Sequence, residues 1–345
     1  MNEAAKPPRD FTYIRPSKGR LSEYEAVTCF TQPDPDVMDA PGWFLRSSEG
    51  RPAWLRDSTH LKHPCWFDFR DPAGMWQRSY VRMQAEQERA LEMLVGQARS
   101  AGVFKDFHPI WISLMLGGHY RVWAYFEYGM FRAFAQAQRE ALSDTLGNVF
   151  SFEAVDRMRH AQAVVIYLME LEDNIPGFKD GGGKQEWLSS PIYQPARRMT
   201  EQVMTLTDWG ELAVAVNLVI DPIFGEVGTS QLLRRFGPVQ GDIVTPSIVM
   251  SAEQDRRRNQ GWTAELVRMV TSETVEEREH NRQLIQDWIN HWTLVALFAT
   301  RALAPVYEMP LIRGGSFAEA FLKAQRAQAE LVQSLGFQPA AEIVP

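Results

Sequence analysis

Two parts of the sequence pair an acidic residue with a later motif that starts Asp-Arg-x-Arg. Glu127 lies within a very apolar segment, and Asp-Arg-x-Arg-His occupies 156–160, so that Arg157 follows Glu127 by 30 residues. The arrangement recurs with Asp221 and with Asp-Arg-x-Arg-Asn at 255–259, where Arg256 follows Asp221 by 35 residues. An acid on an apolar helix needs a partner when it is buried. The recurrence predicts a duplicated helix hairpin.

This layout is the skeleton of a carboxylate-bridged diiron bundle. In such a bundle two helices each give one Glu, and two others each give a Glu-x-x-His pair whose i, i+3 spacing places both ligands on one face. Here Arg157 and Arg256 stand where Glu is required, and Asn259 stands where the second His is required. Guanidinium groups repel cations and stay protonated. We therefore predict a metal-free pseudo-site, with no catalytic or cofactor-binding residue in this chain. It consists of Glu127, Arg157, His160, Asp221, Arg256 and Asn259.

Each of these residues also has a plainer structural interpretation. His160 could be a surviving iron ligand, but a single His without its companions is more often a satisfied core residue. Glu127 and Asp221 could be general bases, yet we expect them to pair with Arg157 and Arg256 in a buried polar network. The Glu-x-x-His at 277–280 lies in a charged run and indicates a solvated helix face or first turn, not a metal site.

The elements that must position these residues are predicted to be helices. Helical patterns recur after the Asp-Pro at 71–72, which suits a helix start, and strand signals are few. We therefore expect an all-α, ferritin-like bundle. Breaks are expected at Gly147, at the Gly-rich turn 180–183, at 236–238, at Pro305 and at 314–315. The expected helices span 71–99, 109–141, 152–173, 196–234, 244–270, 273–304 and 316–335.

The first 70 residues differ from the rest, because they are rich in Pro and aromatic residues without a helical period. They are too apolar to stay in water and too irregular to form a core, so we expect an extended arm over residues 1–70. A helical body should follow over 71–305, and a C-terminal helix and tail over 306–345. Aromatic anchors carry much of the energy of an interface. The candidates for subunit contact are Tyr13, Tyr24, Trp43, Trp54, Trp66 and Trp76.

Composition excludes several classes of protein. A formal net charge of -7 argues against a nucleic-acid binder, which needs a concentrated basic surface. Cys29 and Cys65 are too few for a disulfide scaffold and are not arranged as zinc ligands. We find neither a signal-type segment nor an uninterrupted apolar run of about 18 residues. We therefore expect no membrane span and a cytoplasmic location.

Several short segments, in order along the chain, resemble those of a known family. They are 18–28, 69–72 with 80–84, 208–211 running into 217–222, and 287–292. On these segments the chain resembles the β subunit of the hydroxylase in soluble bacterial multicomponent diiron monooxygenases, which include the propane, tetrahydrofuran, alkene, toluene and phenol monooxygenases. The resemblance implies a ribonucleotide reductase-like helical fold without iron.

The resemblance further implies an (αβγ)2 hydroxylase whose α subunit holds the diiron centre and oxidises a hydrocarbon with O2. A reductase would deliver electrons from NADH, and a small effector protein would gate the reaction. Two other functions remain open at this point. The chain could be a free-standing helical scaffold or adaptor, or an independent diiron oxidase. The missing ligands argue against the second of these.

Overall fold

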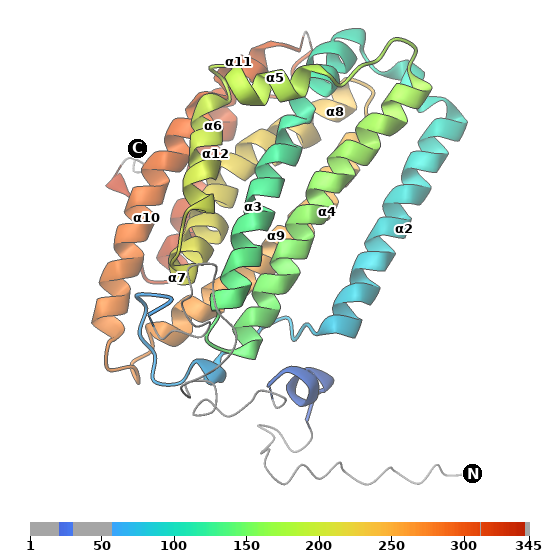
Figure 1. Ribbon diagram of the computed structural model, residues 1–345. Helices are drawn as coiled ribbons and strands as arrows, with labels where there is room; N and C mark the ends of the chain where they lie inside the picture. Colours follow the sequence, from blue (N-terminus) through green and yellow to red (C-terminus); the bar gives the residue numbers. More distant parts are fainter. Residues whose placement is uncertain (1–20, 30–56, 311, 342–345) are drawn as a thin grey trace, which may run out of the picture.

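The described residues form helices joined by turns, without a β-strand among them (Figure 1). The computed structural model describes residues 21–29, 57–310 and 312–341. The expected all-α bundle is therefore confirmed. Two short helices, η1 (Glu25–Cys29) and η2 (Trp66–Asp68), precede the bundle. The bundle begins with α2 (Gln77–Ala101), η3 (Val103–Asp106), η4 (Trp111–Tyr120), α3 (Val122–Glu140), α4 (Asp144–Asn174), α5 (Gly182–Ser189) and α6 (Gln194–Met204). It continues with α7 (Trp209–Ala213), η5 (Val214–Arg234), α8 (Arg235–Val239), α9 (Val244–Val270), α10 (Arg278–Arg301), α11 (Ala304–Glu308) and α12 (Phe317–Ser334).

Four helices, α3, α4, η5 and α9, form the centre of the bundle. α3 packs along α4, η5 packs against α9, and α4 also contacts α9. α2 lies on the outer side of α4, whereas α6 and α10 lie on the opposite edge, and α12 packs on η5 (Figure 1). The interior between these helices is a continuous apolar core. Any charged group at the centre must therefore find its partners among side chains.

Several helix ends follow from local sequence. The Ser143 hydroxyl accepts a hydrogen bond from Leu146 N at 3.2 Å and caps α4. Ser316 and Glu319 form a reciprocal capping box at the start of α12. Gly102 ends α2 in the left-handed conformation, with φ of 74°, which a residue with a side chain rarely adopts. These caps set where the long helices begin and end.

The segment Trp209–Val239 is one long apolar helical run made of α7, η5 and α8. By length and composition it could cross a membrane, but 89% of its most apolar window is buried inside the fold, as in the core helix of a globular protein. Its middle part, η5, is a π-helix of 21 residues with Pro222 inside it. π-helical segments are rare and are frequent at functional sites. Asp221 lies on this segment.

Some expected boundaries were wrong. Gly147 was expected to break the chain, but it lies in the first turn of α4 because the helix already starts behind the Ser143 cap. The expected helix 109–141 is divided into the π-helix η4 and the α-helix α3. The expected helix 196–234 is interrupted between α6 and α7, where Asp208 starts a new helix.

Candidate functional site

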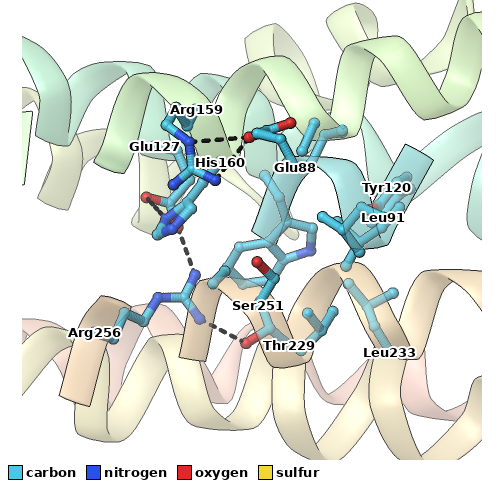
Figure 2. A pocket seen from close by; sticks show the side chains of 16 residues that line it. Glu88, Leu91, Tyr120, Glu127, Arg159, His160, Thr229, Leu233, Ser251 and Arg256 are labelled. Atoms are coloured by element: carbon cyan, nitrogen blue, oxygen red, sulfur yellow. Dashed lines mark hydrogen bonds and ion pairs between the residues drawn. The ribbon is translucent and has the colours of Figure 1, made fainter. Parts of the chain in front are cut away.

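The six pseudo-site residues meet at the centre of the four-helix core. Glu127 comes from α3, Arg157 and His160 come from α4, Asp221 comes from η5, and α9 supplies the remaining two. Figure 2 shows the side chains of Glu127, His160 and Arg256 turned toward one another between these helices. The spacing in the sequence thus predicted a set of residues that the fold brings together.

Arg157 is the centre of the arrangement, and its side chain has no solvent exposure. Its Nη1 atom donates to Asp221 Oδ1 at 3.1 Å and to Glu127 Oε2 at 3.4 Å. Its Nη2 atom donates to Asp221 Oδ2 at 2.5 Å and to Glu153 Oε1 at 2.9 Å. A further bond reaches Asn217 Oδ1 at 3.3 Å. Burial acts to lower the pKa of Arg157, but Asp221, Glu127 and Glu153 raise it well above its usual value, so the cation is held in place.

Arg256 lies on the other side of the same carboxylates. Its Nη2 atom donates to Glu127 Oε1 at 2.5 Å, and its Nη1 atom donates to Thr229 Oγ1 at 3.1 Å. Its Nε atom is 3.9 Å from Asp221 Oδ1, too far for a hydrogen bond. Burial acts to raise the pKa of Glu127, but Arg256 and Arg157 lower it well below its usual range. Glu127 is therefore ionised between two guanidinium groups.

The contacts show how the two acids and the two arginines are arranged. We expected Glu127 and Asp221 to pair with Arg157 and Arg256 in one buried polar network. The shortest contacts are crossed, because Asp221 binds Arg157 at 2.5 Å and Glu127 binds Arg256 at 2.5 Å. Both arginines nevertheless face both carboxylates, within 3.4 Å for Arg157 and 3.9 Å for Arg256. The four groups form one cluster and not two separate ion pairs.

His160 joins this cluster to a second one. Its Nε2 atom is 3.1 Å from Asp255 Oδ2, and its Nδ1 atom is 3.5 Å from Glu127 Oε2. Burial acts to lower the pKa of His160, but hydrogen bonds to Asp255 and Glu127 raise it overall. The ring therefore lies between two carboxylates that belong to different clusters.

The second cluster is built around the acid that begins each repeated motif. Asp156 and Asp255 are both buried, and the Gln84 amide nitrogen donates to each of them at 2.9 Å. Arg258 also binds both, Asp255 at 2.9 Å and Asp156 at short range. Asn259 Nδ2 donates to Asp156 Oδ2 at 3.2 Å. Asn259 thus works as a hydrogen-bond donor in the position expected for a ligand.

Glu153 is the residue of the site that we did not expect. It is fully buried, and its carboxylate accepts from Arg157 and from Asn217 Nδ2, each at 2.9 Å. Burial raises the pKa of Glu153 to about 7, because Arg157 and Asn217 offset the loss of solvation only in part. The signal for this residue was its spacing of four from Arg157, which places both on one face of a helix.

A small cavity adjoins the pseudo-site between α2, α4, α9 and η5. Its volume is about 40 Å³, and its lining is mainly apolar. Figure 2 shows the cavity with the Arg159–Glu88 ion pair at one edge and Arg256 at the other. The Tyr120 hydroxyl lines it without a partner in the described structure, and a buried hydroxyl of this kind is usually satisfied by an ordered water.

The chemistry of this donor set does not suit a diiron centre. The positions that would neutralise two iron ions with carboxylates hold two permanent cations, Arg157 and Arg256. The carboxylates that remain are already bound by these guanidinium groups. Within the described residues, no group of three or more His, Cys, Asp or Glu side chains is placed to hold a metal ion. The arrangement can stabilise a charged core, and it offers no open ligand position.

The six candidates for subunit contact are placed differently from one another. Tyr24 is buried within the chain, and its hydroxyl accepts a hydrogen bond from Asp71 N at 2.9 Å. Trp66 is half-buried and packs edge-on against Trp209, with ring centroids 5.1 Å apart. Trp76 is half-buried at the N-terminus of α2. Tyr13, Trp43 and Trp54 lie outside the described residues.

The segment that carries Trp66 is fastened to the bundle by Asp208. This carboxylate accepts from Thr59 Oγ1 and from His60 N, each at 2.7 Å. It also caps α7 by accepting from Gly210 N at 2.8 Å. His280, from the Glu-x-x-His motif, is exposed and bonds to the His60 carbonyl at 3.0 Å. That motif therefore lies beside this fastened segment.

Comparison with known proteins places these features in context. The family model described as methane/phenol/alkene hydroxylase matches residues 43–274. The chain is 30% identical to the hydroxylase component small subunit of propane 2-monooxygenase from Mycolicibacterium goodii, over 93% of this chain and 86% of that protein. It is 28% identical to the methane monooxygenase component A beta chain from Methylosinus trichosporium, over 86% and 77% of the two chains. A solved structure of phenol hydroxylase from Pseudomonas sp. OX1 matches with a TM-score of 0.77, 18% identity and 92% coverage of both chains, which shows a shared fold.

Proposed function

Because the chain belongs to the methane/phenol/alkene hydroxylase family, as the small or β subunit of a bacterial multicomponent monooxygenase hydroxylase, we propose that it is a non-catalytic structural subunit. Its partner, the α subunit, would hold the diiron centre. The complex would insert one oxygen atom of O2 into a small hydrocarbon. Electrons would come from NADH through a reductase.

One observation carries this proposal. The buried guanidinium group of Arg157 and the largely buried one of Arg256 lie among the carboxylates of Glu127, Asp221 and Glu153 at the centre of the bundle. In a diiron bundle the same region must hold two multivalent cations. A side chain that cannot lose its proton occupies each of the two positions instead. The core keeps the charge balance of the metal site by replacing metal with arginine.

The donor set therefore does not fit the iron centre that the family implies. Any metal would have to displace Arg157 from bonds to four neighbours, three of them carboxylates. Breaking a buried, hydrogen-bonded ion pair leaves uncompensated charges and is strongly unfavourable. That this chain carries no iron remains a prediction. It follows from the residues present and is open to direct measurement.

We propose an (αβγ)2 assembly in which a γ subunit completes the hydroxylase and an effector protein and an NADH reductase act on it. The names of the relatives support the first step, because each describes a small subunit or beta chain of a larger component. A reductase that uses NADH favours a cytoplasmic location. An acidic chain of net charge -7 also favours protein partners over nucleic acid.

We also propose the division into an arm over 1–70, a helical body over 71–305 and a C-terminal part over 306–345. The start of α2 at Gln77 and the end of α10 at Arg301 support the limits of the body. α12 packs on η5, so the C-terminal part would stabilise the body and not form a separate unit. The aromatic residues of the arm would contact a partner subunit.

Expression with and without the α subunit tests the proposed function. Alone, the chain should aggregate or melt at a lower temperature, because a surface made for a permanent partner would be exposed. Co-expression with α should restore a soluble complex of defined mass in a sedimentation experiment. A stable monomer whose melting temperature does not change when α is added would overturn the proposal.

A further inference from the structure

A second pocket lies beside η5, between α9 and α12. Its volume is about 400 Å³, which is within the usual range of small-molecule sites. α9 and α12 both pack on η5, so the walls of the pocket come from three helices that already contact one another. Asp221 and Arg256 line its inner end, and the exposed side chains of Arg257 and Lys323 line its rim. The pocket therefore extends from the surface to the pseudo-site.

Cationic side chains from all three helices line this pocket. Arg234 comes from η5, Arg257 from α9 and Lys323 from α12. Lys323 forms no ion pair with any described residue. Arg257 is 3.9 Å from Glu253, too far for a hydrogen bond. Ammonium and guanidinium groups carry several N–H donors and no acceptor, so both side chains are open to an anionic oxygen.

The carboxylates of the pocket are already bound by donors. Glu253 accepts from the Ser230 hydroxyl at 2.5 Å with one oxygen and from Arg234 Nη1 at 2.8 Å with the other. Glu226 accepts from Gln231 Nε2 at 2.6 Å. The third carboxylate of the lining is the pseudo-site acid on η5, and a guanidinium group binds both of its oxygens. The free donors of the pocket therefore outnumber its free acceptors.

The direction of α12 along η5 follows from contacts at both ends. Gln328 Nε2 donates to Leu218 O at 3.4 Å, near the start of η5. The first residue of α12, Phe317, lies near the other end of η5. Its ring contacts Tyr307, and Tyr307 contacts Phe236 just after η5, with ring centroids 5.5 Å apart in each pair. α12 therefore runs antiparallel to η5, with its start beside the end of η5.

The antiparallel packing separates a cationic part of the pocket from an apolar part. Lys323 lies nearer than Leu331 to the end of η5, where Arg234 is found. Lys323, Ala327 and Leu331 are spaced by four residues, so they share one face of α12 and extend over about 12 Å. Pro222 adds apolar surface from the first half of η5. The cations of α12 and η5 thus lie toward one end of the pocket, and the apolar side chains lie toward the other.

We propose that this pocket binds a small amphiphilic anion, a molecule with a carboxylate or phosphate head and a short aliphatic chain. The head would accept charge-assisted hydrogen bonds from the cationic side chains, and bonds of this kind are the strong ones. Pro222 and the apolar residues of α12 would cover the chain, and the burial of each CH2 group favours binding. The site is formed within this one chain, so the inference does not rest on the proposed function.

Isothermal titration calorimetry with octanoate and with octyl phosphate tests the site. The sample is the hydroxylase purified from co-expression with α, or this chain alone if no complex forms, so a failure of the proposed function leaves the test intact. We expect binding, and the probe that binds more tightly identifies the head group. Acetate and inorganic phosphate supply the head alone, and octanol supplies the chain alone. Each should bind at least about tenfold more weakly, because it occupies only one part of the pocket.

Two pairs of variants on α12 assign the binding to this pocket. Lys323→Glu should weaken binding at least about tenfold, because it removes a donor and places a like charge beside the head. Its control is Arg326→Glu, at an exposed position of the same helix that does not line the pocket. Ala327→Trp should also weaken binding at least about tenfold, because the ring fills the space of the chain. Its control is Ala318→Trp, which is exposed and outside the pocket.

The outcomes separate this pocket from other sources of binding. Loss in Lys323→Glu and Ala327→Trp, with both controls within about twofold of wild type and native helix content by circular dichroism, supports the site. Equal loss in Lys323→Glu and Arg326→Glu would show a general effect of surface charge and overturn the inference. Binding that none of the variants changes lies elsewhere in the sample and also overturns it. Octanol that binds as tightly as octanoate and octyl phosphate, or the absence of binding by both anions, has the same consequence.

Discussion

The substitution Arg157→Glu tests whether the buried arginine replaces the charge of a metal. It removes a fully buried cation whose bonds reach Glu127, Asp221 and Glu153. It adds a carboxylate at the same place. The change restores the Glu-x-x-His spacing with His160, but Arg256 stays in the other half and still repels a metal ion. We expect loss of stability and no gain of iron.

The size of the effect follows from the contacts. Removing one partner of a buried ion pair typically costs about 3–5 kcal/mol. Here Glu127 and Asp221 lose their shared cation, Glu153 loses a hydrogen-bond donor and a new carboxylate is added, so we expect about 5 kcal/mol, the upper end of that range. With an unfolding entropy of about 2.1 cal/mol/K per residue and 345 residues, this loss lowers the melting temperature by about 7 °C.

The assay uses the hydroxylase purified from co-expression of variant chain and α subunit. The melting temperature is measured by tryptophan fluorescence, and iron is measured per α subunit. The control is Arg257→Glu on α9, directly after Arg256. The Arg257 side chain is 75% exposed, so this change should cost no more than about 0.5 kcal/mol. A second pair of variants tests the same cluster. Arg157→Met should lose stability, and the double variant Arg157→Met with Asp221→Asn should recover part of that loss, because Asp221 makes the shortest bond to Arg157. If Arg157→Glu is tolerated as well as Arg257→Glu, the central cluster does not stabilise the fold.

Three other changes address packing, attachment and pH. Gly228→Ala should destabilise the chain by about 1–3 kcal/mol in thermal unfolding, because the new Cβ would lie 2.1 Å from the Trp123 ring. The control is Gly261→Ala, where no atom lies within 4 Å of the new Cβ, and it should be neutral or stabilising. Asp208→Ala should cost about 0.5–2 kcal/mol through loss of the α7 cap, and limited proteolysis should cut more rapidly in the segment it fastens. Burial raises the pKa of Glu153 from 4.5 to about 7. The stability that this shift gives the folded state is complete below about pH 4.5 and is lost as the pH rises through about 7. The melting temperature of wild type should therefore fall between about pH 5 and 8, and Glu153→Gln should remove this fall.

Each of these has a clear contrary result. Equal melting temperatures for Gly228→Ala and Gly261→Ala would mean that the Trp123 ring moves at no cost. An unchanged proteolysis pattern for Asp208→Ala would mean that other contacts hold the segment. If wild type and Glu153→Gln show the same dependence of melting temperature on pH, the carboxyl of Glu153 does not titrate in this range.

The sequence predicted the helical body because its apolar residues recur at helical spacing over long segments. The local errors have physical causes. Gly147 was expected to break the chain. The Ser143 hydroxyl caps α4 by accepting from Leu146 N, so the helix begins before Gly147 and the glycine lies in its first turn. The π-helices η4 and η5 could not be predicted from the sequence. The wider turn of a π-helix is set by packing in the core, and the apolar residues of both segments lie on all sides of the helix, so they show no distinct period.

Six residues of the site could be predicted from their spacing, but Glu153 and Gln84 could not, and neither could the individual contacts. The spacing of three places Arg157 and His160 on one side of α4, which is a property of any helix. Which carboxylate each arginine reaches depends on how four helices cross, and the crossed contacts to Asp221 and Glu127 reflect that geometry. Gln84, which binds the acid of each motif, comes from a helix with no recognisable motif of its own. Long-range partners of this kind follow from tertiary packing alone.

Metal analysis tests the central claim most directly. The hydroxylase would be purified with α present, its subunits separated under conditions that keep iron bound, and the iron in each measured by elemental analysis. We predict that this chain carries no stoichiometric iron, because Arg157 and Arg256 occupy the positions of the metal and its ligands. About two iron ions in each copy of this chain, the content of an intact diiron bundle, would contradict the account.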